Sequence, residues 1–278
     1  MSAVFVVVPE WQGSGSSRAM RLIDGADAVR GDLPASATRT VEVPAGAGEA
    51  LETGVHRYSS ITVVADALGA ELAEAVVDGS VPIVIGGDCG VEFAAVRHAV
   101  QGSAEPVALV WFDAHPDLNT PESSPSGAFH GMVLRTLLGG GPTALAPEAV
   151  LGPDRVVLAG TRAFDEAEAD FAAVAGIPVV SPAELQTSDA LLAAVRATGA
   201  RRVYLHVDLD VIDPGEMNGI AFPEPFGVGV AELTAGIRAL REEFDLVGAG
   251  ITEFAPATPE AAVDDLPAIL RIVSALVR

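Results

Sequence analysis

The sequence predicts an α/β protein whose mostly parallel, eight-stranded sheet is covered by helices on both faces. Short β-branched runs alternate along the chain with alanine- and leucine-rich segments of helical length. The apolar runs are nearly continuous, which is typical of strands that are buried on both faces. The chain has 278 residues with no internal repeat and no break in composition, so we expect a single domain over residues 1–278.

Each strand candidate is a run of valine, isoleucine, leucine and aromatic residues that is followed by glycine or by polar residues. In chain order these runs are 4–8 (VFVVV), 40–43 (TVEV), 81–87 (VPIVIGG), 106–112 (PVALVWF), 155–160 (RVVLAG), 177–180 (IPVV), 202–210 (RVYLHVDLD) and 245–254 (DLVGAGITEF).

The helix candidates lie between these strands and repeat apolar residues at helical spacing. In chain order they cover roughly 55–78, 90–101, 130–138, 188–199, 230–243 and 264–277. The stretches 121–127 and 139–153 are rich in glycine and proline, and we expect them to be loops within the domain.

Composition narrows the possible partners. The chain has 38 acidic and 16 basic residues, a net charge of -22, and such a surface repels nucleic acids and anionic membranes. All the basic residues are arginines, which excludes chemistry that needs a lysine. One cysteine, no signal peptide and no apolar stretch of membrane-spanning length lead us to expect a cytoplasmic protein.

Polar segments directly follow five of the predicted strands: GGDCG, FDAHPDLN, GTRAFD, HVDLDVIDP and TEFAP. Ligands of open parallel sheets bind beyond the carboxyl ends of the strands, so these segments should meet at one edge of the sheet.

Two of these segments carry possible metal ligands at alternate residues. Asp113, His115 and Asp117 follow one strand, and Asp208 and Asp210 follow another. Alternate residues of an extended chain point to the same side. Several unpaired carboxylates repel one another, and no lysine is present to neutralise them, so divalent cations are expected here. Carboxylates with some imidazole suit Mn²⁺, and two such ions would activate a water molecule.

The motifs GGD, FDAHPDLN, SGAFHG, DLDVIDP and TEFAP resemble, in order and spacing, those of the arginase or ureohydrolase family, which includes arginase, agmatinase and formimidoylglutamase. The resemblance runs from the strand at 81 to Pro256. It implies a three-layer α/β/α sandwich, which agrees with the strand pattern. It also implies hydrolysis of an amidino C–N bond by a hydroxide that bridges two Mn²⁺ ions, in a homo-oligomer, a trimer or hexamer.

The resemblance also implies roles for single residues. Asp113 and Asp208 would bridge both metals, Asp117 would ligate one of them, and His115 with Asp210 would ligate the other. The remaining two catalytic candidates are His130, as a proton shuttle at the mouth of the site, and Glu253, facing the substrate guanidinium.

The substrate-binding loop resembles the form found in arginases. By that resemblance Asn119, Ser124 and Ser126 would bind the α-carboxylate of an amino acid, and Asp165 would lie near its α-amino group. This favours L-arginine as the small guanidino substrate over agmatine. The alternative for all four residues is an ordinary polar loop.

Cys89 departs from the family pattern, in which a histidine that ligates the first metal follows GGD. A cysteine thiolate would favour Zn²⁺, Fe²⁺ or another softer ion, with Co²⁺ and Ni²⁺ also open. A neutral thiol, which we favour because nearby carboxylates oppose ionisation, would leave that metal weakly held. A small buried residue is the third interpretation. His206 could compensate as a ligand, although a core histidine bonded to backbone is the preferred interpretation.

Two other functions therefore stay open. The chain could be a metal-deficient, non-catalytic subunit on the same scaffold, or a single-metal amidohydrolase of the deacetylase type. Retention of the other ligand-type residues argues against the first, and the pair Asp208 and Asp210 together with Glu253 argues against the second.

Overall fold

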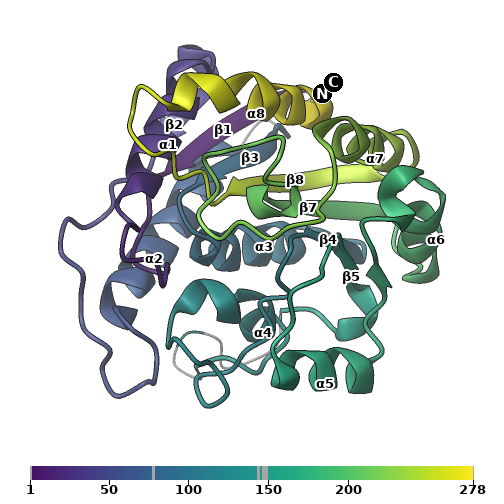
Figure 1. Ribbon diagram of the computed structural model, residues 1–278, viewed down its shortest axis with the longest axis horizontal. Coiled ribbons are helices and arrows are strands. Elements are labelled where there is room, and N and C mark those ends of the chain that lie inside the picture. The colour runs from purple at the N-terminus through teal and green to yellow at the C-terminus, as the bar shows by residue number, and fades with distance from the viewer. Residues whose placement is uncertain (1, 77–78, 143–144, 146–149, 278) are drawn as a thin grey trace.

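The structure, a computed structural model, describes residues 2–76, 79–142, 145 and 150–277 (Figure 1). The end of the helix expected over 55–78 and part of the loop expected over 139–153 lie outside these residues. None of the described helices combines the length and the apolar character that crossing a bilayer requires.

Eight parallel strands form one sheet in the order β2-β1-β3-β8-β7-β4-β5-β6. The strands are β1 (Ala3–Val8), β2 (Thr38–Thr40), β3 (Val81–Gly86), β4 (Val107–Phe112), β5 (Val156–Ala159), β6 (Val179–Val180), β7 (Arg202–Asp208) and β8 (Asp245–Thr252). Four of the five predicted polar segments follow the central strands β3, β8, β7 and β4. The fifth, GTRAFD, follows β5. The side chains of the four central strands are almost all buried, as their continuous apolar sequences predicted.

Helices cover both faces of this sheet (Figure 1). They are α1 (Arg21–Gly31), α2 (Tyr58–Ala75), α3 (Glu92–Gln101), α4 (Val133–Leu137), α5 (Glu166–Ala175), α6 (Asp189–Ala197), α7 (Val230–Glu243) and α8 (Ala262–Val277). Apolar residues of α1, α6, α7 and α8 pack on one face, and those of α2, α3, α4 and α5 pack on the other. The predicted α/β fold with helices on both faces of a parallel sheet is confirmed.

Three elements differ from the expectation. The helices α1 and α5 were not predicted, and the second strand lies at Thr38–Thr40 rather than 40–43. This edge strand pairs with β1 alone, and the chain beyond it turns away, with the carbonyl of Pro44 accepting a hydrogen bond from Gln12 Nε2 at 2.7 Å. The predicted second strand therefore lay too far toward the C-terminus.

Candidate metal centre and active site

Four buried side chains meet beyond the carboxyl ends of β3, β4 and β7. Cys89, Asp113, His206 and Asp208 each offer one ligand atom, and these atoms lie within 4.8 Å of one another. We call these residues the inner group. Each of the four residues is no more than 3% exposed, so a cation held here would be shielded from bulk water.

A second cluster, the outer group, consists of Asp113, His115 and Asp210, whose ligand atoms also lie within 4.8 Å of one another. The Nδ1 atom of His115 lies 2.8 Å from Asp210 Oδ2 and 3.7 Å from Asp113 Oδ1. The His115 side chain is 32% exposed, so this group lies nearer to solvent than the inner group. Asp113 belongs to both groups, which is the arrangement that a carboxylate shared by two metal ions requires.

Local hydrogen bonds explain the spacing of the ligands along the chain. The N–H of His115 donates to Asp113 Oδ1 at 2.6 Å, and the N–H of Asp210 donates to Asp208 Oδ1 at 2.8 Å. Each aspartate thus holds the turn that carries the next ligand two residues on. The expected extended geometry is wrong beyond the strand ends: Asp113 follows β4 in a loop, and Asp210 lies in a short 3₁₀ turn.

The electrostatics of the two groups follow from burial and from their like charges. Burial opposes protonation of His115, but Asp113 and Asp210 beside it raise its pKa to about 12. Burial among other carboxylates raises the pKa of Asp210 to about 6 and that of Asp208 well above its ordinary value. Burial likewise raises the pKa of the Cys89 thiol, and Asp208 adds to the effect. A divalent cation would relieve this repulsion, so the donor set fits the divalent metals that the resemblance implies.

Asp117 and Glu253 belong to neither group but lie close to both. Each adopts a left-handed backbone conformation, with φ of 52° at Asp117 and 65° at Glu253, which is uncommon for residues with a side chain. Each also has one buried carboxylate oxygen without a hydrogen-bond partner in the described part of the structure. Strained backbone and unpaired buried oxygens together indicate positions selected for function rather than for stability.

A cavity of about 240 Å³ opens above the outer group. Its walls contain His115, Asp117, His130, Asp208 and Asp210, together with four of the predicted substrate-binding residues, Asn119, Ser124, Ser126 and Asp165. Glu253, the fifth residue predicted to contact substrate, does not line this cavity. At its rim Asn119 Nδ2 donates to Asp165 Oδ2 at 2.9 Å, and the hydroxyl oxygens of Ser124 and Ser126 lie 3.4 Å apart. The segments that follow β4, β5 and β7 therefore meet at this cavity with the loop that contains Ser124 and Ser126, whereas GGDCG and TEFAP do not line it.

His130 lies in the wall of this cavity. Its ring stacks on Phe222 with 4.8 Å between centroids, and its Nδ1 lies 3.6 Å from Glu253 Oε1. Burial, together with the neighbouring positive His115, lowers the pKa of His130 to about 4. The ring is therefore neutral at pH 7 and can accept a proton.

Cys89 and His206 contact each other within the inner group. Cys89 Sγ lies 3.8 Å from His206 Nε2 and donates a hydrogen bond to Asp208 Oδ2 at 3.0 Å. The thiol is thus a donor in this structure, as expected for the neutral form. His206 differs from the preferred interpretation, because its ring nitrogens face Glu92, Asp113 and Cys89 and not a backbone group.

Several residues of the site were not predicted. Phe222 lies in an irregular loop without a periodic pattern, and Glu92 begins α3 in a sequence that reads as an ordinary helix. Glu168 accepts hydrogen bonds from the N–H groups of Leu118 and Asp165, both at 2.9 Å. A sequence signal existed only for Glu168, which forms a capping box with Asp165 three residues earlier.

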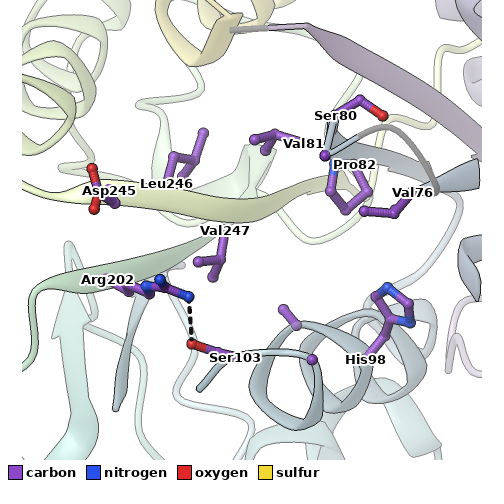
Figure 2. A pocket seen from close by; sticks show the side chains of 13 residues that line it. Val76, Ser80, Val81, Pro82, His98, Ser103, Arg202, Asp245, Leu246 and Val247 are labelled. Carbon is purple, nitrogen blue, oxygen red and sulfur yellow. Dashed lines mark hydrogen bonds between the residues drawn. The ribbon is translucent and has the colours of Figure 1, made fainter. Parts of the chain in front are cut away.

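A larger cavity, of about 350 Å³, lies at the opposite edge of the sheet (Figure 2). It is lined by the amino ends of β3, β7 and β8 and by the end of α3, and there Arg202 Nη1 donates to Ser103 Oγ at 3.2 Å. Neither metal-ligand group lies in it. Since ligands of open parallel sheets bind at the carboxyl ends of the strands, the smaller cavity is the candidate active site.

Comparisons of the sequence and of the fold find relatives of this chain among known proteins. The sequence model described as the arginase family matches residues 16–274. The chain is 31% identical over 233 residues to an arginase from Bacillus caldovelox, a match that covers 79% of this chain and 77% of that protein. It is 32% identical over 205 residues to an N(omega)-hydroxy-L-arginine amidinohydrolase from Streptomyces lavendulae, covering 72% of this chain and 71% of that protein.

The fold is also similar to those of solved structures. An arginase from Entamoeba histolytica, solved in complex with L-ornithine, superposes with a TM-score of 0.87 at 23% identity. The superposition covers 99% of both chains, so the whole fold has a counterpart there.

Proposed function

The chain belongs to the arginase family of amidinohydrolases, and we propose that it hydrolyses the guanidino group of L-arginine, or of a close derivative of it, to release urea. The observation that carries this proposal is the cavity above the outer group, which has carboxylates at its base and amide and hydroxyl groups at its rim. One end of this cavity suits a cation, and the other suits the polar end of an amino acid.

The base of the cavity would bind the guanidinium. Asp117, Asp208 and Asp210 line it, and Glu253 lies beyond His130. A planar guanidinium donates paired hydrogen bonds to a carboxylate, which a neutral amide cannot accept with comparable strength. We assign Glu253 to this contact because one of its oxygens is buried without a partner in the described residues.

The rim would bind the amino-acid end of the substrate. The hydroxyl groups of Ser124 and Ser126 and the amide of Asn119 can donate to an α-carboxylate, and the carboxylate of Asp165 can accept from an α-amino group. Agmatine has no α-carboxylate, so these donors favour L-arginine over agmatine.

The proposed chemistry requires two divalent metals. Membership of the arginase family implies them, and the two clusters of possible ligands in this chain are suited to hold them. Asp113, His115, Asp208 and Asp210, together with Asp117, would hold them, and this carboxylate-rich set favours Mn²⁺. When bound, the two ions would supply a nucleophile from water near neutral pH.

The residues of the chain would orient the reaction and move its protons. Glu253 would hold the guanidinium while its carbon gains an oxygen and its bond to the substrate amine breaks. His130, in the wall of the cavity, would pass a proton from water to the leaving amine. Phe222, stacked on the ring, would keep His130 at the mouth of the cavity.

The relatives support a substrate of this class. The Entamoeba histolytica arginase was solved with L-ornithine, the amine that remains when urea is removed from L-arginine. The relative from Streptomyces lavendulae is named for N(omega)-hydroxy-L-arginine, so this hydroxylated guanidine belongs among the candidates. We further propose a cytoplasmic homo-oligomer, a trimer or hexamer, which sedimentation velocity of the purified protein would test.

The decisive experiment measures the release of urea and formamide with Mn²⁺, Zn²⁺, Fe²⁺, Co²⁺ or Ni²⁺ supplied in turn. The substrates are L-arginine, N(omega)-hydroxy-L-arginine, agmatine, guanidinobutyrate, guanidinopropionate and formimidoylglutamate. L-arginine or its hydroxylated derivative should be preferred with Mn²⁺. Preference for agmatine, guanidinobutyrate, guanidinopropionate or formimidoylglutamate would refute the proposed substrate, and absence of turnover with every metal would favour a non-catalytic subunit.

A variant at the rim of the cavity tests whether the rim binds the α-carboxylate of the substrate. Ser126→Ala should raise KM for L-arginine, because it removes a donor to the α-carboxylate, and leave KM for agmatine unchanged. Ser17→Ala, on the surface outside the cavity, is the matched control. An equal effect of Ser126→Ala on both substrates would show that the rim does not bind the carboxylate.

A further inference from the structure

His206, the histidine of the inner group, lies fully buried on the central strand β7. Its Nε2 atom faces the group, 3.6 Å from Asp113 Oδ2 and 3.8 Å from Cys89 Sγ. Its ring stacks on Trp111, with 3.6 Å between centroids and an interplanar angle of 26°. The Trp111 indole also donates to Asp113 Oδ2 at 3.1 Å, so one side chain holds both the ring and the shared carboxylate.

The other ring nitrogen of His206 faces a second buried carboxylate. Its Nδ1 lies 3.6 Å from Glu92 Oε2, and both residues are 0% exposed. Within the described residues, neither oxygen of Glu92 has a hydrogen-bond partner, and neither does Nδ1 of His206. Because an unpaired buried carboxylate is costly, Glu92 can accept from a protonated Nδ1 after a small adjustment, while the buried Tyr204 hydroxyl lies near the same carboxylate.

The fold leaves room for Glu92 at this position. Gly250 of β8 pairs with His206, and a Cβ atom at Gly250 would lie only 1.7 Å from Glu92 Oε1. A side chain at Gly250 would therefore displace the carboxylate from behind the ring. A histidine with a carboxylate on one nitrogen presents the lone pair of the other nitrogen, which is the usual arrangement of a metal-bound imidazole.

The distances in the inner group fit a single cation. Ligand atoms that share one metal at about 2.1 Å lie roughly 3.0 to 3.5 Å apart, and slightly farther apart where one of them is sulfur. The separation of 3.6 Å from His206 Nε2 to Asp113 Oδ2 is close to this range, and all four ligand atoms lie within 4.8 Å of one another. The group can therefore enclose an ion with little movement.

We propose that His206 Nε2 is the nitrogen ligand of the inner metal, replacing the imidazole that position 89 lacks, and that Glu92 is the positioning residue that fixes its tautomer. The histidine thus comes from the floor of the site, on β7, whereas Cys89 follows β3 in the wall. The inference rests on the proposed function only in requiring that a divalent metal binds here.

Metal stoichiometry tests this inference directly. Mn²⁺ bound to the purified full-length protein is measured by equilibrium dialysis and elemental analysis, with circular dichroism as the check on folding. His206→Asn should lose one of two bound equivalents, or bind it at least roughly 100-fold more weakly, and Glu92→Gln should weaken the same step by about 10- to 100-fold. His98→Asn, at the opposite edge of the sheet (Figure 2), is the matched control and should retain both equivalents.

A spectroscopic measurement keeps the test valid if His206→Asn does not fold. In His115→Asn protein, His206 is the only imidazole left in the two groups. With ¹⁵N-labelled histidine and bound Mn²⁺, pulsed electron paramagnetic resonance should detect nitrogen coupling to the metal in this variant. Glu92→Gln in the same background should change the size of that coupling.

Two results would overturn the inference: wild-type binding of both equivalents by folded His206→Asn, or no nitrogen coupling in His115→Asn protein that holds Mn²⁺. These results are distinguishable from failure of the proposed function. A wild-type protein that binds two metals through His206 but releases no urea would refute the function alone, while normal urea release by a His206→Asn protein with both metals would refute this inference alone.

Discussion

Without divalent metals, the titration of Asp210 should lower the stability of the fold as pH rises from about 4 to about 7. Burial and neighbouring carboxylates raise the pKa of this group from 3.8 to about 6. Between these values the folded chain holds a proton that the unfolded chain has lost, so the free energy of unfolding decreases with pH. His115 adds to this trend above its ordinary value of 6.5, because its raised pKa contributes stability that is lost as pH rises. His130 acts in the opposite sense, because burial lowers its pKa to about 4, so the Asp210 effect is measured as the difference between the wild type and Asp210→Asn.

The size of the effect follows from the pKa of Asp210. One pKa unit corresponds to about 1.36 kcal/mol, so a rise from 3.8 to about 6 corresponds to about 3 kcal/mol lost between pH 4 and pH 7. This is a large part of the roughly 5 to 15 kcal/mol that stabilises an ordinary domain. With metals bound the trend should reverse, because the ligands bind as deprotonated groups and binding releases protons.

The assay is urea denaturation of metal-stripped and Mn²⁺-saturated protein at several pH values between 4.5 and 7.5, a range chosen to span the raised pKa of about 6, followed by tryptophan fluorescence. In metal-stripped Asp210→Asn protein, the free energy of unfolding should fall by about 3 kcal/mol less than in the wild type as pH rises. Asp66→Asn, an exposed carboxylate on α2, should leave that fall unchanged. The reasoning is refuted if the free energy of unfolding of Asp210→Asn depends on pH in the same way as that of the wild type.

Three further predictions concern the site itself. Asp113→Ala should remove metal from both groups together with activity, because its carboxylate belongs to both; full metal occupancy by elemental analysis would contradict this. Glu253→Gln should lower kcat for L-arginine by roughly 10²- to 10³-fold with both metals retained, and an unchanged kcat would remove Glu253 from the substrate contact. Phe222→Ala should lower kcat by up to roughly 100-fold by releasing the His130 ring, and a change in KM alone would show that Phe222 binds substrate instead.

Most of the sheet was predictable from the sequence, because strands buried on both faces have continuous apolar runs that local pattern alone identifies. The helix α1 was missed for a long-range reason. It contains Gly25, which weakens the helical pattern, yet a Cβ there would lie 1.9 Å from the carbonyl oxygen of Phe254. Close packing against a distant segment therefore requires a residue that locally disfavours the helix.

In the candidate site too, contacts between residues close in sequence were predictable and contacts between distant residues were not. The spacing of Asp113 and His115 was predictable because each aspartate holds a turn two residues long, and such turns are local in sequence. The contact of His206 with Glu92 was not predictable, because the two residues are 114 positions apart and meet only through the order of the strands. The capping box at Asp165 and Glu168 was present in the sequence and would have located α5.

The different depths of the two ligand groups have a kinetic consequence. The side chains of the inner group are no more than 3% exposed, whereas His115 in the outer group is 32% exposed and lines the open cavity. Of the inner group only Asp208 lines this cavity, so an ion that reaches the other inner ligands from it passes beside His115 and Asp210 of the outer group. Loading is then sequential, and the ion that enters first is the last to leave. A brief exposure to a chelator would consequently strip one ion quickly and the other slowly, even where the two equilibrium affinities are equal.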